Sequence, residues 1–109
     1  MNHNVEQVRK LNDAARTSGT GADFFTTPGV SELPFLDYIA VIGLMKGFDA
    51  FTEDNDPHGE HDFGAFDYKG IKYFWKFDYY DLEHKYHSPD PSNPEVTRRV
   101  LTLMTAAEY

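Results

Sequence analysis

The apolar positions at the start of the chain predict a helix followed by a short strand. Residues 1–17 repeat apolar side chains at helical spacing with charged residues between them, and either Asn2 or Asn4 is placed to cap the first turn. A Ser-Gly-Thr-Gly segment at residues 18–21 then ends the helix. Residues 22–26 are predicted to form a short strand, closed by a Thr-Pro-Gly turn.

A second helix is predicted over residues 34–48, with Ser31 as its N-cap and Pro34 in its first turn. Its side chains are apolar on most sides, and we therefore expect this central helix to be buried. Gly43 and Gly47 lie within the segment and lower its helix propensity. We interpret these glycines as sites of close packing against another backbone or as a frayed end.

Strict alternation in the second half of the chain predicts a β-hairpin. In residues 71–79 every second side chain is apolar or aromatic, which places one face of this strand in the core. Residues 61–68 are expected to pair with it through a two-residue turn at Lys69-Gly70. Residues 95–109 fit either a helix or a third strand. We favour a strand at residues 100–104 followed by a helical turn, because an isolated hairpin is only marginally stable.

These elements predict one α+β domain that spans residues 1–109. We expect a small antiparallel β-sheet of three or four strands, with the N-terminal helix and the buried central helix packed on one face. The chain is 40% hydrophobic and 16% aromatic, which suits one modest core. It contains no cysteine, which excludes disulfides and thiolate metal sites.

Charge and hydropathy narrow the classes of partner. The formal net charge is −8, opposite in sign to the basic footprint of a nucleic-acid-binding protein, so direct binding of nucleic acid is not expected. The acidic surface either keeps the protein soluble or meets a basic surface on a protein partner. The longest apolar run, residues 38–45, is too short for a membrane span, and the N-terminus lacks a secretory apolar region. We expect a cytoplasmic protein without a membrane partner.

The most unusual chemistry of the sequence lies between Phe51 and Asp81. An acidic, turn-rich loop at residues 53–62 precedes the predicted hairpin, which contains the only tryptophan. We interpret the carboxylates and the histidine of this loop, together with two aromatic side chains on the second face of the strand, as binding residues. These candidate residues are Glu53, Asp54, Asp56, Glu60, His61, Asp62, Phe74 and Tyr80.

Two kinds of metal site are alternatives to the interpretation that the loops rich in histidine and acidic residues are simply solvated. The pairs His58-x-x-His61 and His84-x-x-His87 provide four imidazoles, enough for a tetrahedral zinc ion if the two loops meet. The Asp-Asn-Asp of residues 54–56 and Gly59 match part of an EF-hand loop, but Ala65 stands where that loop needs a bidentate glutamate. Solvated loops are favoured, and we assign no metal and no cofactor.

Hydrolytic chemistry is an alternative for the same loop. His61 can pair with Asp54, Asp56 or Asp78, and such a dyad would serve as a general acid or base. The acidic neighbours of His61 in sequence point away from it in a strand, and no serine or cysteine nucleophile motif accompanies it. We favour a structural role, in which the carboxylates of the loop bond nearby backbone groups, over a catalytic role. We therefore assign no catalytic residue.

Four ordered segments of the sequence resemble a bacterial family of unknown function, number 3768. They are DNDPHGEHDFGAF at residues 54–66, FWKFDYYD at 74–81, SPDP at 88–91 and RVLTLM at 99–104. The resemblance extends to Leu11-Asn12-Asp13 and implies no particular activity. The family is associated with plasmid-like and prophage-like regions, which implies a small accessory protein, such as one that counters a host defence.

We therefore expect a non-enzymatic acidic binding protein that inhibits its partner by occupying a basic, nucleic-acid-binding surface, as in anti-CRISPR or antirestriction action. The alternatives are a metal-binding or hydrolytic domain centred on the DNDPHGEHD loop, and a structural homo-oligomer whose acidic loop only maintains solubility. The binding hypothesis predicts that charge reversal at four loop positions abolishes binding and leaves the melting temperature nearly unchanged. These positions are Glu53, Asp54, Asp56 and Glu60.

Overall fold

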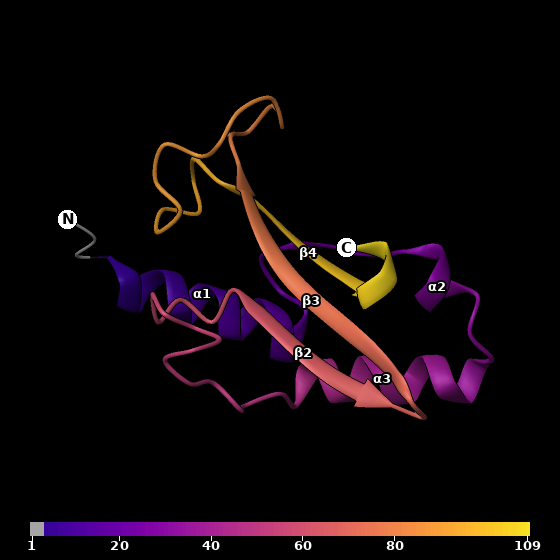
Figure 1. The fold of residues 1–109 in the computed structure, drawn as a ribbon. Helices are drawn as coiled ribbons and strands as arrows, with labels where there is room; N and C mark the ends of the chain where they lie inside the picture. Colours follow the sequence, from indigo (N-terminus) through magenta and orange to yellow (C-terminus); the bar gives the residue numbers. More distant parts are fainter. Residues whose placement is uncertain (1–3) are drawn as a thin grey trace.

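The computed structural model of the chain describes residues 4–109, and it confirms the α+β class. Three helices, four strands and a final 3-10 turn follow one another along the chain (Figure 1). In order they are α1 (Val5–Ser18), β1 (Asp23–Thr26), α2 (Pro28–Ser31), α3 (Phe35–Lys46), β2 (Phe63–Tyr68), β3 (Ile71–Tyr80), β4 (Arg98–Thr105) and η1 (Ala106–Glu108). The chain end thus forms a strand and a helical turn, as predicted, and not a long helix.

The sheet has the strand order β1-β4-β3-β2 and is mixed, so the expectation of a purely antiparallel sheet is wrong. Strands β2, β3 and β4 are antiparallel neighbours. The edge strand β1 runs parallel to β4, with Asp23 opposite Val100 and Thr26 opposite Leu103. Side-chain alternation cannot report this direction, because it shows which face a residue occupies and not how a distant strand is oriented.

The hairpin follows its sequence pattern closely. Lys69 and Gly70 both have positive φ, 50° and 81°, as a two-residue primed turn requires. Tyr73, Trp75, Phe77 and Tyr79 of β3 are buried, while the first residue of this face, Ile71, is half exposed at the hairpin tip. The alternation therefore predicts the core face of β3 correctly except at its end.

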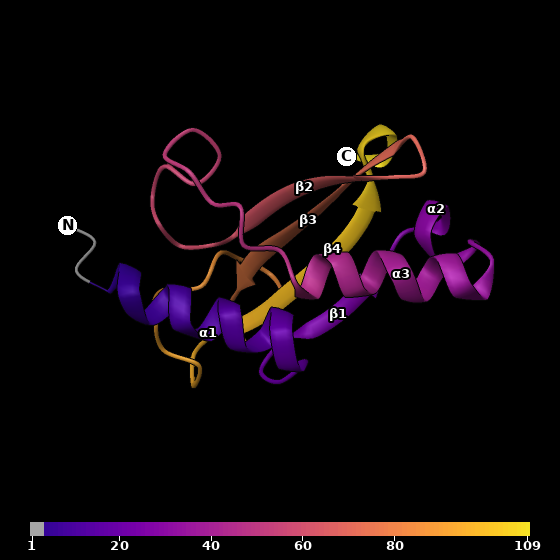
Figure 2. The ribbon, with the colours of Figure 1, turned by 90° about the horizontal axis from the view of Figure 1, so that it is seen from below.

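Helices α1 and α3 pack on the same face of the sheet, next to each other (Figure 2). The core lies between these helices and the inner side chains of β3 and β4. Within residues 4–109, no long helix covers the opposite face of the sheet (Figure 1), and we call this the open face. The buried core residues are Val8, Ala15, Val30, Val41, Met45, Tyr73, Trp75, Phe77, Tyr79, Leu101 and Leu103.

The expectation that the central helix is buried is wrong. Only Val41 and Met45 of α3 are buried, and its remaining large apolar side chains reach solvent or the rim of the core. A sheet covers only one side of a helix that packs on it, and residues 4–109 supply no second layer above α3. No helix in the described part of the chain is long and apolar enough to cross a membrane.

The ends of the helices differ in detail from the sequence predictions. Asn4 is the N-cap of α1, but its side chain makes no capping hydrogen bond, and the alternative cap, Asn2, lies outside the described residues. Gly19 ends α1 in a left-handed conformation with φ of 80°, as predicted. The Thr-Pro-Gly turn forms the start of the one-turn helix α2, so Ser31 belongs to α2 and Pro34 precedes the first turn of α3.

Candidate functional site

The long loop between α3 and β2, residues 47–62, is held against α1 by side chains of that helix. Arg9 donates from Nη1 to the carbonyl oxygen of Gly59 at 2.8 Å. Asn12 donates from Nδ2 to the carbonyl oxygen of Glu60 at 3.0 Å. These bonds join the acidic loop to a helix about fifty positions earlier in the chain, so the loop is anchored on its inner side.

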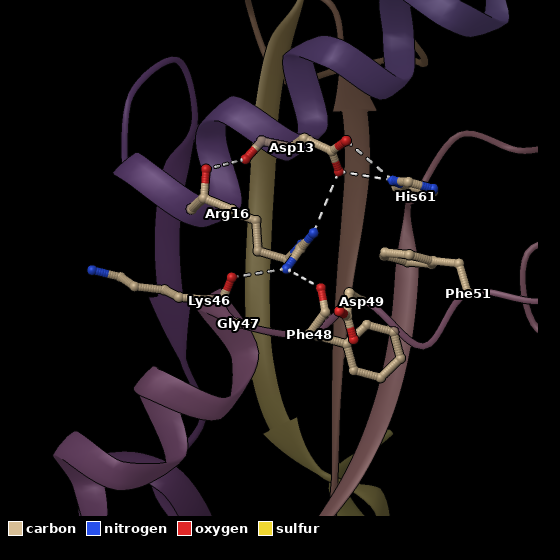
Figure 3. A pocket seen from close by; sticks show the side chains of 9 residues that line it. Asp13, Arg16, Lys46, Gly47, Phe48, Asp49, Phe51 and His61 are labelled. Carbon is tan, nitrogen blue, oxygen red and sulfur yellow. Dashed lines mark hydrogen bonds and ion pairs between the residues drawn. The ribbon is translucent and has the colours of Figure 1, made fainter.

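His61 is the centre of this attachment. Its Nδ1 lies 2.8 Å from Oδ1 of Asp13, and its ring stacks on Phe51 with the ring centroids 3.7 Å apart (Figure 3). Asp56 accepts a hydrogen bond from the His61 backbone N–H at 3.1 Å, and its other carboxylate oxygen lies 3.7 Å from Nε2. A carboxylate therefore lies near each ring nitrogen of His61, and an aromatic ring covers one of its faces.

Arg16 connects α1 to the end of α3. Its Nη1 donates to the carbonyl oxygens of Met45, Lys46 and Phe48 at 2.9, 3.1 and 2.9 Å. Helix C-terminal carbonyls lack partners within their own helix, and a guanidinium can satisfy several of them at once. The guanidinium carbon also lies 4.8 Å from the centre of the Trp75 ring. Burial lowers the pKa of Arg16, although neighbouring Asp13 acts in the opposite direction.

These anchoring residues of α1 are absent from the candidates drawn from the sequence, although a signal for them exists. They occupy helical positions i, i+3, i+4 and i+7, so they form one polar stripe on α1. Such a stripe on a helix is usually solvated, and the sequence alone does not show that a loop covers it. The stripe consists of Arg9, Asn12, Asp13 and Arg16.

An open groove of about 500 Å³ lies where the stripe, the end of α3 and the loop meet (Figure 3). The only hydroxyl group in its lining belongs to Thr17, which donates to the backbone of Asp13 at 2.7 Å. The groove thus contains a His–Asp pair, and its one hydroxyl group is engaged by the backbone. Its lining consists of Asp13, Arg16, Thr17, Lys46, Gly47, Phe48, Asp49, Phe51 and His61.

A second polar cluster lies beneath the loop and includes Glu60. Tyr79 donates its hydroxyl hydrogen to Oε1 of Glu60 at 3.2 Å and accepts a bond from Nδ2 of Asn12 at 2.8 Å. Arg99 donates from Nε to Oδ1 of the same asparagine at 2.7 Å. Asn12 is fully buried, and burial raises the pKa of the Tyr79 hydroxyl. Buried polar groups require such partners, so this cluster is part of the core.

The structure separates the predicted loop residues into two groups. Asp56, Glu60 and His61 point inward and hold the loop in place. Glu53 and Asp54 are exposed at the loop tip. Asp62 is intermediate, and its pKa is raised first by burial and then by the negative charge of Glu60. Of the predicted loop residues, Glu53 and Asp54 are therefore the carboxylates most open to a partner.

The two predicted aromatic residues lie on the open face and not beside the groove. Phe74 packs against Phe63 and Tyr109 at centroid distances of 5.1 and 5.4 Å. Tyr80 borders a shallow hollow of about 480 Å³ on the same face, next to the Lys76–Asp78 ion pair. The acidic loop and these aromatic side chains thus belong to different sides of the sheet.

The histidine pairs predicted for zinc are not brought together. Across residues 4–109, no three His, Asp or Glu side chains are placed to hold one metal ion. His84 lies near Asp23, with Nε2 3.8 Å from Oδ2, and His87 packs edge-on against Tyr79. The partial EF-hand pattern also forms no cage, because Ala65 lies within β2. The metal alternative has no assembled site in the described chain.

Comparison with known proteins gives one finding. A family model described as "Protein of unknown function (DUF3768)" matches residues 26–108, about three quarters of the chain. The match begins at Thr26, so it includes the acidic loop and the hairpin but not Leu11-Asn12-Asp13 or the rest of α1. No curated protein sequence and no solved structure matches the chain. The family match confirms the resemblance found in the sequence, and the chain belongs to the DUF3768 family.

Proposed function

We propose that this domain is a non-enzymatic binding protein whose acidic loop tip engages a basic surface on a protein partner. The observation that carries the proposal is the contrast between the two sides of one loop. Its inner side is fixed to α1 through Glu60 and His61, and Asp56 in turn bonds the backbone of His61, whereas Glu53 and Asp54 on its outer side are exposed. The fold thus exposes carboxylates that form no ion pair with any other described residue, on a loop whose position is fixed by α1.

The charge of the loop supports this role. Residues 47–62 contain six acidic residues and no lysine or arginine. Among the residues that the structure describes, Asp49, Glu53 and Asp54 form no ion pair, while lysines elsewhere on the surface are paired with Asp37, Asp67 and Asp78. Unpaired carboxylates gathered on one loop create a local negative potential that attracts a basic surface.

The tip is also ordered by its own hydrogen bonds. Asn55 accepts a bond from the Thr52 backbone N–H at 2.8 Å and donates from Nδ2 to Ala50 at 2.9 Å. The backbone N–H of Asp56 bonds the carbonyl of Thr52 at 2.8 Å. A loop that is already ordered loses little conformational entropy when it binds. The carboxylates of Glu53 and Asp54 would therefore be held ready for a partner.

A nucleic-acid-binding protein is the class of partner that fits best. Such proteins carry clustered Lys and Arg side chains that normally meet phosphates, and clustered carboxylates satisfy the same cations. We further propose that this partner belongs to a host defence system, so that the domain acts in the cytoplasm as an inhibitor such as an anti-CRISPR or antirestriction protein; this step rests on the mobile-element setting that the sequence resemblance implies. The contacts of His61 favour a bracing role over catalysis, because carboxylates of Asp13 and Asp56 lie near both ring nitrogens.

Charge reversal tests the proposal. The test variant carries Glu53→Lys and Asp54→Lys, and the control carries Glu83→Lys and Glu95→Lys, which are also exposed and change the net charge equally. Each protein is immobilised and used to capture proteins from a bacterial lysate, with and without competing duplex DNA. We expect the wild type and the control to capture the same protein and competing DNA to displace it. The test variant should fail to capture this protein.

Two results would contradict the proposal. Equal capture by the test variant and the wild type would show that the loop tip does not bind. An equal loss of captured protein in the test variant and the control would show that capture responds only to the net charge of the domain. Asp56 and Glu60 are excluded from the variant because both hold the loop in place, so the earlier expectation that all four positions can be reversed without loss of stability is revised to Glu53 and Asp54.

A further inference from the structure

Helix α3 leaves an apolar surface without a partner in the described chain. Phe35 and Leu36 are 73% and 79% exposed, and Ile39 and Leu44 are 49% and 42% exposed. We call these four side chains the α3 outer face. Single exposed apolar residues are ordinary, but a contiguous group on one helix marks an interaction surface. Asp37 does not interrupt it, since its carboxylate turns toward the hairpin and accepts hydrogen bonds from Tyr68 and Lys69, and exposed Lys46 lies at its C-terminal edge.

Small residues give this surface a shape that suits another helix. Ala40 and Gly43 lie on the same side of α3 as Leu36 because of helical periodicity, and Gly47 follows as the C-cap residue. An added Cβ at Gly43 would meet no atom within 4 Å, so packing within the chain does not require a glycine there. A helix-interior glycine is unfavourable, and a second helix that approaches closely would provide the missing packing.

We propose that α3 binds the α3 of a second copy of this chain, so that the two helices pair in antiparallel orientation about a twofold axis. With about 200 Å² for a fully exposed large apolar side chain, the α3 outer face offers roughly 500 Å² per copy. Two copies would bury about 1,000 Å², the lower limit for a specific interface. A self-complementary patch of this kind is what a twofold dimer requires.

The charges at the two ends of α3 select the antiparallel orientation. The C-terminal end carries Lys46 and leads into the acidic segment with Asp49, Glu53 and Asp54, so this end is net negative. The N-terminal end adjoins the hairpin tip, where Lys69 and Lys72 are exposed and paired with aspartates. Parallel pairing would place two acidic ends together, whereas antiparallel pairing places each acidic end beside the hairpin tip, where Lys69 and Lys72 balance two aspartates and Glu32 is the remaining acidic residue. This inference does not depend on the proposed function of the loop tip.

Sedimentation equilibrium of the full chain, loaded from roughly 1 to 200 µM, tests the association in the range expected for an interface of this size. We expect a shift from the 12.5 kDa monomer to twice that mass, and no loss of dimer in 1 M salt, because the contact is apolar. Ile39→Asp and Gly43→Trp should each raise the dimer dissociation constant roughly tenfold or more. Leu82→Asp, at an exposed loop position, is the control.

Single cysteines test the orientation, because the chain has none of its own. Ala40 lies near the middle of α3 and Leu36 near its end. In the antiparallel dimer, oxidised Ala40→Cys protein should form a disulfide between copies, and Leu36→Cys protein should not. Circular dichroism checks that each variant is folded.

A wild type that stays monomeric at the highest concentration would overturn the proposal, and so would a dimer that neither Ile39→Asp nor Gly43→Trp weakens. Loss of the dimer in the Leu82→Asp control would place the contact elsewhere. Equal crosslinking of the Leu36→Cys and Ala40→Cys proteins would overturn the antiparallel orientation.

Discussion

The Nδ1 atom of His61 lies 2.8 Å from the carboxylate of Asp13, although the two residues are 48 positions apart in the chain. This contact ties the acidic loop to a helix that precedes the segment matched by the family model. It also explains why His61 can hold a positive φ of 54°, since several contacts compensate the strain. The position of the loop is therefore a property of the tertiary structure and not of the loop itself.

Loss of this contact should loosen the loop. We expect Asp13→Ala to lower the free energy of unfolding by about 1 to 3 kcal/mol, because it removes a charge-assisted hydrogen bond to His61 and an ion pair to Arg16. Urea unfolding measures the loss, and hydrogen exchange should show faster exchange of the Asp56 and Gly59 amides.

Asp67→Asn is the matched control for this variant. The Asp67–Lys72 pair is solvent-exposed on both sides, so its loss should change stability by less than about 0.5 kcal/mol. If Asp13→Ala were as mild as this control, the contact between Asp13 and His61 would not brace the loop.

The role of Arg16 at the end of α3 predicts that lysine cannot replace it. A single lysine ammonium cannot take the place of both Nη1, which bonds the three carbonyl oxygens, and Nη2, which pairs with Asp13. We expect Arg16→Lys to cost about 2 kcal/mol or more, because buried carbonyls lose their donors. The free energy of unfolding is the measurement, and the exposed Arg98→Lys serves as control with almost no change. Equal stabilities of the two variants would contradict the capping role.

Gly64 lies opposite Trp75 in the hairpin and leaves no room for a side chain. An added Cβ would come within 2.6 Å of Cζ2 of the indole ring. We expect Gly64→Ala to destabilise the fold by about 1 to 3 kcal/mol through overpacking and to alter the emission of this single tryptophan. In a double-mutant cycle, Trp75→Phe should relieve part of that cost. Simple additivity of the two changes would show that the clash is not the cause.

Glu108 should make stability depend on pH. Its carboxylate accepts hydrogen bonds from the Thr27 hydroxyl first, and from the backbone N–H groups of Thr105 and Gly29, which lower its pKa from 4.5 to about 2. A depressed folded-state pKa gives stability that is present above about pH 5 and is lost as pH falls toward 2.

Urea unfolding at several pH values tests this contribution. Glu108→Gln should be less stable than the wild type near pH 7, and the difference should shrink toward pH 2. Exposed Glu95→Gln is the control. A difference that stays constant with pH would show that the charge of Glu108 is not responsible.

Periodicity alone determined most of the secondary structure. Alternation over β3 and the Lys69-Gly70 turn predict the hairpin, because both are local consequences of strand geometry and of the left-handed backbone of the turn. The α+β class is predicted in the same way, with three or four strands, and the structure has four. The composition of residues 53–62 likewise identifies a loop, since its turn-forming residues act on their own backbone.

Only the tertiary structure decided how these helices, strands and loops are oriented and which of their faces are buried. The parallel direction of β1, the exposure of the α3 outer face and the inward position of His61 all depend on residues far away in the sequence. Asp13 and Asp54 are the same residue type, yet one binds His61 and the other remains exposed. The local sequence pattern indicates whether a segment prefers a helix, a strand or a loop. Contacts between residues that are far apart in the sequence depend on how the whole chain packs.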